Sequence, residues 1–349
     1  MNRENYSEAQ GFIVTYKSLN EPLLFNELNG RCPGLKLLDR GEDSAAFTVP
    51  DYAAVVSEIR REDFIFLQHI HPFMCKCEIT GSASDFSEFA KMLEGIRPYV
   101  AKEDTLTCQC RIAARRMMEY SNGELTNLLT SLLEKENYTV SLQDADTAVS
   151  LTIFDHFAYL GISCLADNCS DRAGGVLFYS KTDDIICRAE FKIEEAFKVF
   201  DVNVTKGMKA LDLGAAPGGW THYLSKRGIF VDAVDPAELN ESVVRRENVA
   251  HYKMTAQEFA EKYVENAYDI IVNDMKMDTN ESIDILCDMS RHLKTNGICL
   301  LTLKLPKQGV QKRINVARKV LSSKFEIVRV RQLYYNRSEV TVFVKNKLS

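Results

Sequence analysis

Residues 210–220 read A-L-D-L-G-A-A-P-G-G-W, and this stretch decides the fold of the chain. A short apolar run, residues 208–213, leads into a glycine-rich bend, and an amphipathic run, residues 221–227, follows it. That order predicts a strand, a tight turn and a helix, as at the first crossover of a doubly wound α/β domain. Gly214 allows the sharp turn, and Pro217 suits the first turn of a helix, where its missing N–H costs nothing.

The spacing of the glycines distinguishes between ligands. The G-x-G-x-x-G pattern of dinucleotide sites is absent, because the glycines fall at 214, 218 and 219. The pattern D-x-G-x-x-P-G-G-W resembles the S-adenosylmethionine loop of the FtsJ-type RNA ribose methyltransferases. A tight turn without a ligand is the alternative. The resemblance implies that S-adenosylmethionine is the cofactor and that the loop binds it through Asp212, Gly214, Ala215, Pro217, Gly218, Gly219 and Trp220.

Length, charge and cysteine content bound the class of protein. The 349 residues predict two or three compact units, and no apolar run is long enough to cross a bilayer. The polar start has no signal-peptide core, and ten scattered cysteines predict reduced thiols in the cytoplasm. The net charge is −6, yet residues 301–349 hold 12 basic and 2 acidic residues. This asymmetry predicts a basic face that meets nucleic acid, with a solvated helix face as the alternative.

The first half of the chain predicts two small α+β regions, residues 1–62 and 63–165, followed by a linker over 166–186. In the second region, two helices against a mixed sheet precede the glycine-rich domain. That order resembles a THUMP-type RNA-binding domain and implies a docking role. Three arginines of this region are candidate phosphate contacts, namely Arg111, Arg115 and Arg116.

Four cysteines of the second region raise the question of zinc. Cys75 and Cys77 form one C-x-C pair, and Cys108 and Cys110 form another. Each pair faces one way on its expected strand, so four sulfurs would converge on a metal if the two strands were neighbours. Buried cysteines that pack as small apolar side chains are the favoured alternative, and no metal is expected.

Residues 187–349 predict a Rossmann-like class I methyltransferase domain. After the glycine-rich loop, apolar runs alternate with helical stretches and end in an antiparallel pair, which gives a mostly parallel seven-stranded sheet. The second strand ends at Asp235, about 20 residues past the loop, a spacing that suits ribose hydroxyls. Where relatives often place an acid that reads the adenine, this chain has Thr255, so Thr255, Gln257 or a backbone carbonyl is the candidate contact.

Four charged residues fall at matching points of this domain. Lys192 lies in R-A-E-F-K-I-E-E-A-F-K-V-F, Asp274 in N-D-M, Lys304 in L-K-L-P and Glu339 in R-Q-L-Y-Y-N-R-S-E-V-T-V. These words resemble the K-D-K-E tetrad of FtsJ-type 2′-O-methyltransferases, and most closely a bacterial subfamily that methylates a cytidine ribose of 23S rRNA. The resemblance implies large-subunit rRNA as the partner. Ordinary surface ion pairs are the alternative.

The chemistry implied by the resemblance needs a base. A ribose 2′-hydroxyl is a poor nucleophile until its proton is removed, and Lys304 is the candidate base. Its pKa would have to fall from about 10.4 to roughly 7–8, which burial and the charge of Lys192 would promote. Asp274 would orient the amine and the hydroxyl, and Glu339 would hold Lys192. The competing hypotheses are an RNA-binding assembly factor with an idle cofactor pocket and a class I methyltransferase with a non-RNA substrate.

Overall fold

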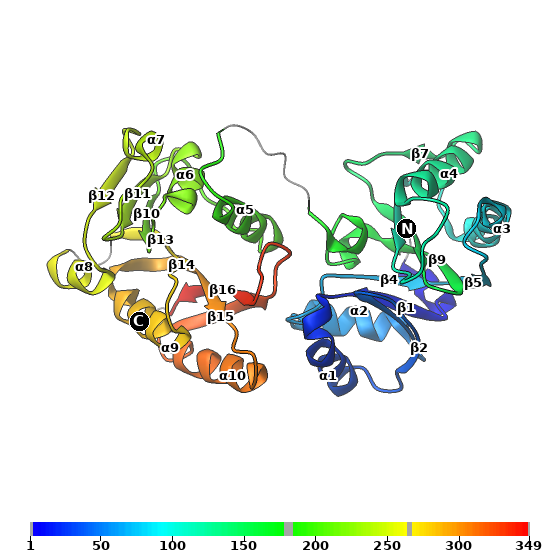
Figure 1. The fold of residues 1–349 in the computed structure, drawn as a ribbon, viewed down its shortest axis with the longest axis horizontal. Helices are drawn as coiled ribbons and strands as arrows, with labels where there is room; N and C mark the ends of the chain where they lie inside the picture. The colour runs from blue at the N-terminus through cyan, green and yellow to red at the C-terminus, as the bar shows by residue number, and fades with distance from the viewer. Residues whose placement is uncertain (1–2, 178–183, 264–266, 348–349) are drawn as a thin grey trace. The chain divides into compact units, whose positions relative to one another are not determined.

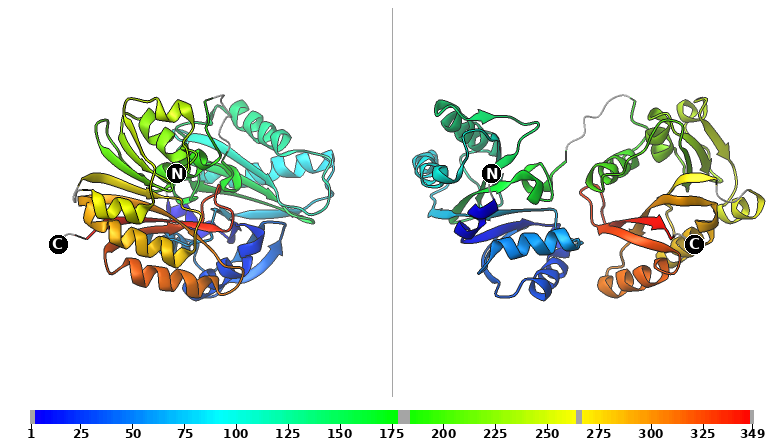
Figure 2. Two further views of the ribbon diagram at one scale, coloured as in Figure 1. Left: turned by 60° about the vertical axis from the view of Figure 1, so that its left-hand side comes forward. Right: turned by 180° about the vertical axis from the view of Figure 1, so that it is seen from behind.

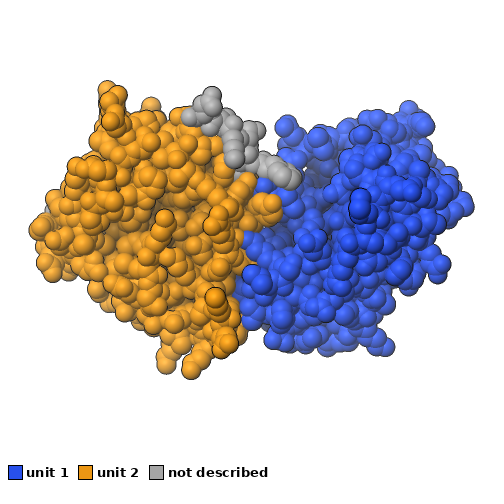
Figure 3. Space-filling view, in the orientation of Figure 1, with its two compact units in different colours: residues 1–177 blue, residues 178–349 orange. Residues whose placement is uncertain are grey.

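The chain divides into two compact units, Met1–Leu177 and Phe178–Ser349 (Figures 1 and 3). The structure is a computed structural model that describes residues 3–177, 184–263 and 267–347. The division falls inside the expected linker, 166–186, of which residues 178–183 lie outside the described residues. The first part of that stretch is folded, because the Ile70 backbone N–H donates to the carbonyl oxygen of Asn168 at 3.1 Å.

The N-terminal unit contains a four-stranded sheet with the order β2-β3-β1-β4. Its helices α1 (Glu21–Arg31) and α2 (Tyr52–Arg61) lie against it, and Asp51 caps α2 by accepting from Ala54 N. Strand β4 lies in the second expected region, which begins at residue 63, so the two expected regions share this sheet. The strands are β1 Gly11–Thr15, β2 Lys36–Arg40, β3 Ser44–Thr48 and β4 His69–Phe73.

A second, five-stranded sheet of this unit has the order β5-β9-β8-β6-β7. Its apolar core lies against α3 (Phe86–Ile96) and α4 (Asn122–Lys135). Ser121 and Glu124 form a capping box at the start of α4. Two helices on a mixed sheet agree with the α+β prediction. The strands are β5 Cys75–Glu78, β6 Thr105–Ile112, β7 Thr139–Val140, β8 Thr147–Ile153 and β9 Phe157–Cys164.

The strand order rules out the zinc hypothesis for the two C-x-C pairs. Cys75 and Cys77 lie on β5, whereas Cys108 and Cys110 lie on β6, and β9 and β8 separate these strands. Strands three positions apart are about 14 Å from each other. Among the described residues there is no group of His, Cys, Asp and Glu that would hold a metal ion. The cysteines belong to the apolar core or pack against it.

The C-terminal unit has the predicted seven-stranded sheet, in the order β12-β11-β10-β13-β14-β16-β15. All neighbours are parallel except the pairs that β16 forms with β14 and β15. The switch in strand order lies between β10 and β13, where such sheets bind ligands. The strands are β10 Lys209–Leu213, β11 Phe230–Val234, β12 Val249–Tyr252, β13 Tyr268–Asn273, β14 Leu293–Lys304, β15 Phe325–Arg331 and β16 Glu339–Asn346.

Helices cover both faces of this sheet (Figures 1 and 2). Helices α5 and α6 pack together on one face, and α9 and α10 on the other. The first face buries Trp220 and the apolar stripe of α5. The helices are α5 Ala189–Val199, α6 Gly219–Lys226, α7 Glu241–Val244, α8 Ala256–Lys262, α9 Thr279–Asp288 and α10 Val310–Leu321.

The glycine-rich loop differs from the prediction at one point. Helix α6 begins at Gly219, and Pro217 precedes it in a cis peptide bond with Ala216, so Pro217 is not in the first helical turn. Gly218 is the N-cap of α6, with a φ of 108°. In the described parts of the chain, no helix has the length and apolar character of a membrane span.

Candidate active site

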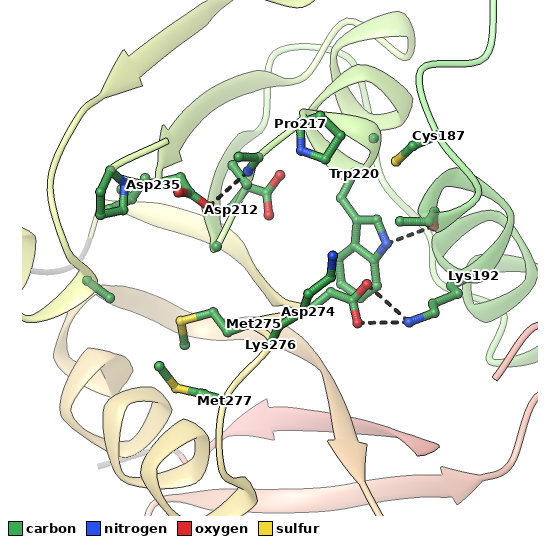
Figure 4. A pocket seen from close by; sticks show the side chains of 18 of the residues that line it. Cys187, Lys192, Asp212, Pro217, Trp220, Asp235, Asp274, Met275, Lys276 and Met277 are labelled. Atoms are coloured by element: carbon green, nitrogen blue, oxygen red, sulfur yellow. Dashed lines mark hydrogen bonds and ion pairs between the residues drawn. The ribbon is translucent and has the colours of Figure 1, made fainter. Parts of the chain in front are cut away.

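A cavity of about 690 Å³ lies at the carboxyl ends of the parallel strands of the C-terminal unit. A volume of this size is ordinary for a small-molecule site. Residues from the glycine-rich loop, the start of α5, and the segments after β11, β12 and β13 line it. Figure 4 shows Asp212 and Asp235 along one side and Lys192 with Asp274 at the other end.

The glycines of the loop leave room where a side chain would collide. At Gly214, where φ is +72°, a Cβ atom would come 2.4 Å from Met275 Cγ. At Gly219 it would come 2.6 Å from Cys187 Sγ. Both glycines line the cavity, so the loop backbone is open to a ligand. This cradle, with a cavity of suitable size and two acidic residues, fits S-adenosylmethionine, and the residues that would hold it are those of the loop.

The two acidic residues of the cofactor side are held by short hydrogen bonds. Thr221 Oγ1 donates to Asp212 at 2.6 Å, and burial raises the pKa of Asp212 to about 7. Asp235 accepts from the backbone N–H groups of Ala216 at 3.0 Å and Ala237 at 2.8 Å. Each Asp235 oxygen accepts one of these bonds and keeps a second lone pair, so it remains able to accept from a hydroxyl.

Three of the four expected catalytic residues come together at the other end. Lys192 Nζ lies 3.1 Å from Asp274 Oδ1 and 2.9 Å from Glu339 Oε2. Burial disfavours the charged lysine, but the two carboxylates outweigh it and raise the pKa of Lys192. Burial raises the pKa of Asp274, against the effect of Lys192. Lys192 is therefore a protonated bridge between two strand ends.

Lys304 is placed by strand pairing. It is the last residue of β14 and lies directly opposite Glu339, the first residue of β16. Directly opposed residues of antiparallel strands project from the same face, with Cβ atoms about 5 Å apart. Among the described residues Lys304 forms no ion pair, and it does not line the cavity as Lys192 does. Its backbone is fixed by Thr279 Oγ1, which donates to the Lys304 carbonyl oxygen at 2.7 Å.

Helix α5 is anchored to the cofactor loop. Trp220 Nε1 donates to the Ala189 carbonyl oxygen at 2.8 Å (Figure 4). Behind the loop, buried His222 Nδ1 lies 2.9 Å from Glu190 Oε2. These contacts fix the helix that carries Lys192 relative to the turn that precedes α6. The tryptophan of the motif therefore aligns two halves of the site.

The two candidate side chains for contact with the adenine, Thr255 and Gln257, differ in the hydrogen bonds that they already form. Thr255 Oγ1 donates to Glu258 Oε2 at 3.0 Å and accepts from Glu258 N at 3.2 Å, which makes the capping box of α8. A hydroxyl has one proton, so Thr255 has no second donor. Gln257 also lines the cavity and is exposed.

Most of the expected cofactor residues line the cavity, and so do residues that the sequence analysis did not name. Gly218 does not line the cavity. In the N-terminal unit, Arg111 pairs with Asp43, and the guanidinium groups of Arg115 and Arg116 donate to backbone carbonyls, so the three arginines stabilise their own fold. The missed lining residues lie inside the motif words or next to them, and this position was the only signal for them: Cys187, Arg188, Met275, Lys276, Met277, Tyr335 and Arg337.

Two relatives with the same name resemble this chain in sequence. Ribosomal RNA large subunit methyltransferase M of Pseudoalteromonas translucida is 28% identical over 265 residues, or 69% of this chain and 71% of that protein. The protein of that name from Aeromonas salmonicida is 34% identical over 176 residues, or 47% of this chain and 48% of that protein.

Among solved structures, TrmN from Thermus thermophilus aligns with a TM-score of 0.37 and 15% identity, over 97% of this chain and 99% of that one. This structural similarity is too weak to support an inference about fold or function. Residues 185–349, in contrast, match the model of the FtsJ-like methyltransferase family over the whole cavity and its tetrad. The C-terminal half of this chain belongs to the FtsJ-like methyltransferases, whose cofactor is S-adenosylmethionine.

Proposed function

We propose that this protein is an RNA 2′-O-ribose methyltransferase that acts on a cytidine of 23S rRNA. The observation that carries the proposal is the cation of Lys192 held between Asp274 and Glu339 at the end of the cofactor cavity, with Lys304 opposite Glu339. The names of the relatives support large-subunit rRNA as the substrate. A methyltransferase with a non-RNA substrate would not need this set of two lysines and two carboxylates.

The tetrad divides the work between its members. When bound, S-adenosylmethionine supplies an activated methyl group, so the chain must align the acceptor and remove one proton. Lys192 is a poor base because its two carboxylates raise its pKa and keep it protonated. We assign the proton of the 2′-hydroxyl to Lys304, whose amine projects from the same sheet face as Glu339. Asp274 then orients the hydroxyl, and Glu339 holds Lys192.

We propose that the N-terminal unit is a THUMP-type module that docks RNA. Its sheet of five strands with α3 and α4 supports this role. All ten cysteines are free thiols, which suits the reducing cytoplasm. A chain that begins at residue 184 should keep its cofactor affinity, measured by calorimetry, and lose most of its rate on RNA. A full rate in that shortened chain would contradict the docking role.

We further propose that Gln257 reads the adenine of the cofactor. Its amide offers both an acceptor and donors, whereas the Thr255 hydroxyl is committed to the helix cap. Gln257→Ala should weaken S-adenosylmethionine binding about tenfold, the value of one or two hydrogen bonds. Thr255→Ser, which keeps the cap, should leave affinity unchanged. An unchanged affinity in Gln257→Ala would contradict this assignment.

The decisive experiment maps ribose methylation in total RNA from cells with and without this protein. One cytidine of 23S rRNA should lose its 2′-O-methyl group in the cells that lack it, and the purified protein should restore the mark. Loss of a base methyl group, or of a protein methylation only, would assign another substrate. Normal methylation with defective ribosome assembly would favour an assembly factor.

A further inference from the structure

The connection between β15 and β16, residues 332–338, is fixed by side-chain hydrogen bonds along its length. Asn336 Oδ1 accepts from Leu333 N at 2.8 Å and from Thr341 Oγ1 at 3.1 Å. Gln332 Nε2 donates to the carbonyl oxygen of Arg337 at 3.2 Å. Leu305 N donates to the carbonyl oxygen of Ser338 at 2.7 Å. We call this segment the 332–338 turn, and its conformation is set by the protein rather than by solvent.

The strongest anchor of the turn comes from helix α5. Glu195 is buried, with 3% of its surface exposed, and its two oxygens accept from Tyr334 N at 2.6 Å and Tyr335 N at 2.8 Å. A buried carboxylate normally needs a cation or several N–H donors. Here the backbone of the turn supplies two donors, so the carboxylate is placed to hold the turn.

The same helix holds both ends of the connection to β16. Glu195 follows Lys192 by three residues, a spacing that places side chains on neighbouring positions of one helix face. Lys192 pairs with Glu339 just after the turn, and Glu195 binds the backbone within it. Phe191 also contacts the turn, with its ring centroid 5.1 Å from that of Tyr335. One helix therefore sets the position of the turn relative to the tetrad.

The turn lies on the side of the cavity that the cofactor loop does not occupy. The loop and the acidic residues follow β10 and β11, and the adenine end follows β12, which all lie on one side of β13 in the sheet. Tyr335 and Arg337 line the cavity from the other side, next to β16. Arg337 is exposed, and among the described residues its guanidinium has no carboxylate partner.

We propose that the 332–338 turn is the acceptor wall of the site, with Arg337 contacting an RNA phosphate next to the target ribose and Glu195 acting as its positioning residue. This inference rests on the proposed function and names its contact with the substrate. Arg337 carries the charge that a phosphate needs, and Glu195 holds the turn through the backbone N–H groups of Tyr334 and Tyr335. The tetrad then receives the ribose at a fixed distance from a held phosphate.

Two variants of the full chain test the proposal. Arg337→Gln should raise the KM for RNA about five- to tenfold and reduce the slope of log affinity against log salt by about 0.7–1, the value of one phosphate contact. Glu195→Gln keeps the size of the side chain but turns one acceptor into a donor that faces a backbone N–H. It should raise the KM for RNA similarly and leave S-adenosylmethionine affinity unchanged.

The double variant separates positioning from general damage. If Glu195 acts through the turn, the effects of Glu195→Gln and Arg337→Gln on RNA affinity should not add. Glu194→Gln, one residue away on α5, and Arg245→Gln, on an exposed ion pair with Glu241, are the matched controls and should change neither value.

The outcomes also separate this proposal from the proposed function. RNA affinity is measured by filter binding with S-adenosylhomocysteine present, so it does not depend on turnover. An unchanged salt slope in Arg337→Gln, additive effects in the double variant, or an equal loss of cofactor affinity in Glu195→Gln would overturn the acceptor wall. A wild-type protein that binds 23S rRNA fragments but methylates no ribose would overturn the proposed function. The salt dependence of RNA affinity and the double-variant comparison would still test the acceptor wall in that case.

Discussion

Two histidines of the N-terminal unit and Lys192 of the C-terminal unit respond to burial in different ways. In the N-terminal unit, His69 Nε2 lies 2.9 Å from Gln109 Oε1 and His71 Nε2 lies 2.9 Å from Thr152 Oγ1. Burial lowers the pKa of His69 to about 3 and that of His71 to about 4, so both rings are neutral. In the C-terminal unit, Lys192 is half-buried, but it remains charged because it lies between two carboxylates.

The contrast between the two units shows that reactive residue types alone do not make a functional site. In the N-terminal unit, His69 and His71 form neutral hydrogen bonds, the C-x-C cysteines pack in or against the apolar core, and Arg111 and Arg116 bind a carboxylate and backbone carbonyls. In the C-terminal unit, Lys192 forms ion pairs with Asp274 and Glu339, and these three residues line a cavity at the strand ends. A cavity with retained charge, rather than the residue types themselves, marks the reactive centre.

The largest effect should come from Lys304. Lys304→Ala should slow methyl transfer about 10²–10⁴-fold in single-turnover assays, as loss of a general base does. S-adenosylmethionine affinity should stay the same. Lys304→Arg should fail nearly as badly, because a guanidinium does not release its proton at working pH. If the arginine variant keeps most of the rate, Lys304 is an electrostatic clamp and Asp274 becomes the candidate base.

The next effect concerns the cofactor cradle. Gly219→Val should reduce S-adenosylmethionine affinity at least about 100-fold, because its side chain would occupy the space between Cys187 and the loop backbone. Gly30→Ala, in an open position of α1, is the control for glycine replacement. Adding Cys187→Ala to Gly219→Val should restore part of the affinity in calorimetry. No recovery together with an altered circular dichroism spectrum would show a folding defect instead.

Acid should weaken the N-terminal unit through its histidines. The folded-state pKa values of His69 and His71 lie below the usual 6.5, so below pH 6.5 the unfolded chain binds protons that the folded chain does not. The unfolding free energy should therefore fall between pH 7 and pH 5, by about 2 kcal/mol per histidine. Urea titrations followed by hydrogen exchange in β4 measure it. His71→Gln should remove about half of this dependence, and an unchanged dependence would contradict the assignment.

Asp212 should act with the opposite sign in the C-terminal unit. Its folded-state pKa of about 7 lies above the unfolded value of 3.8, so the folded chain binds the extra proton and stability rises as the pH falls from 7 toward 4. Asp212→Asn should abolish this contribution in urea titrations followed by hydrogen exchange in β10.

The smallest expected effect concerns the charge of the cofactor. S-adenosylmethionine, which carries one more positive charge than S-adenosylhomocysteine, should gain affinity relative to it by less than about tenfold between pH 6 and pH 8.

Much of the fold followed from the sequence because its signals are local. The apolar run that ends near Asp235 predicted the second strand of the C-terminal sheet, and the glycine-rich loop predicted the class of domain. Pairing between distant strands was not local. Nothing near Cys75 or Cys108 indicates that β9 and β8 separate their strands, and nothing near His69 assigns β4 to the first sheet.

The site divides in the same way. Lys192, Asp274 and Glu339 were found because each lies inside a recognisable word, and the structure brings them together. Glu195 was missed because its partners are backbone N–H groups 139 and 140 residues away, which leave no side-chain pattern. The role of Thr255 as the N-cap of α8 could have been predicted from the sequence, since Thr255 and Glu258 have capping-box spacing before an apolar residue.

The pairing of β14 with β16 makes the site sensitive to odd and even changes in chain length. Lys304 opposes Glu339, and side chains alternate between faces at every residue of a strand. A single residue inserted at the start of β16 would turn the carboxylate to the far face of the sheet or create a bulge. Two inserted residues would restore the face. Parity therefore limits which insertions this hairpin can tolerate while still presenting a lysine and a carboxylate on the same face of the sheet.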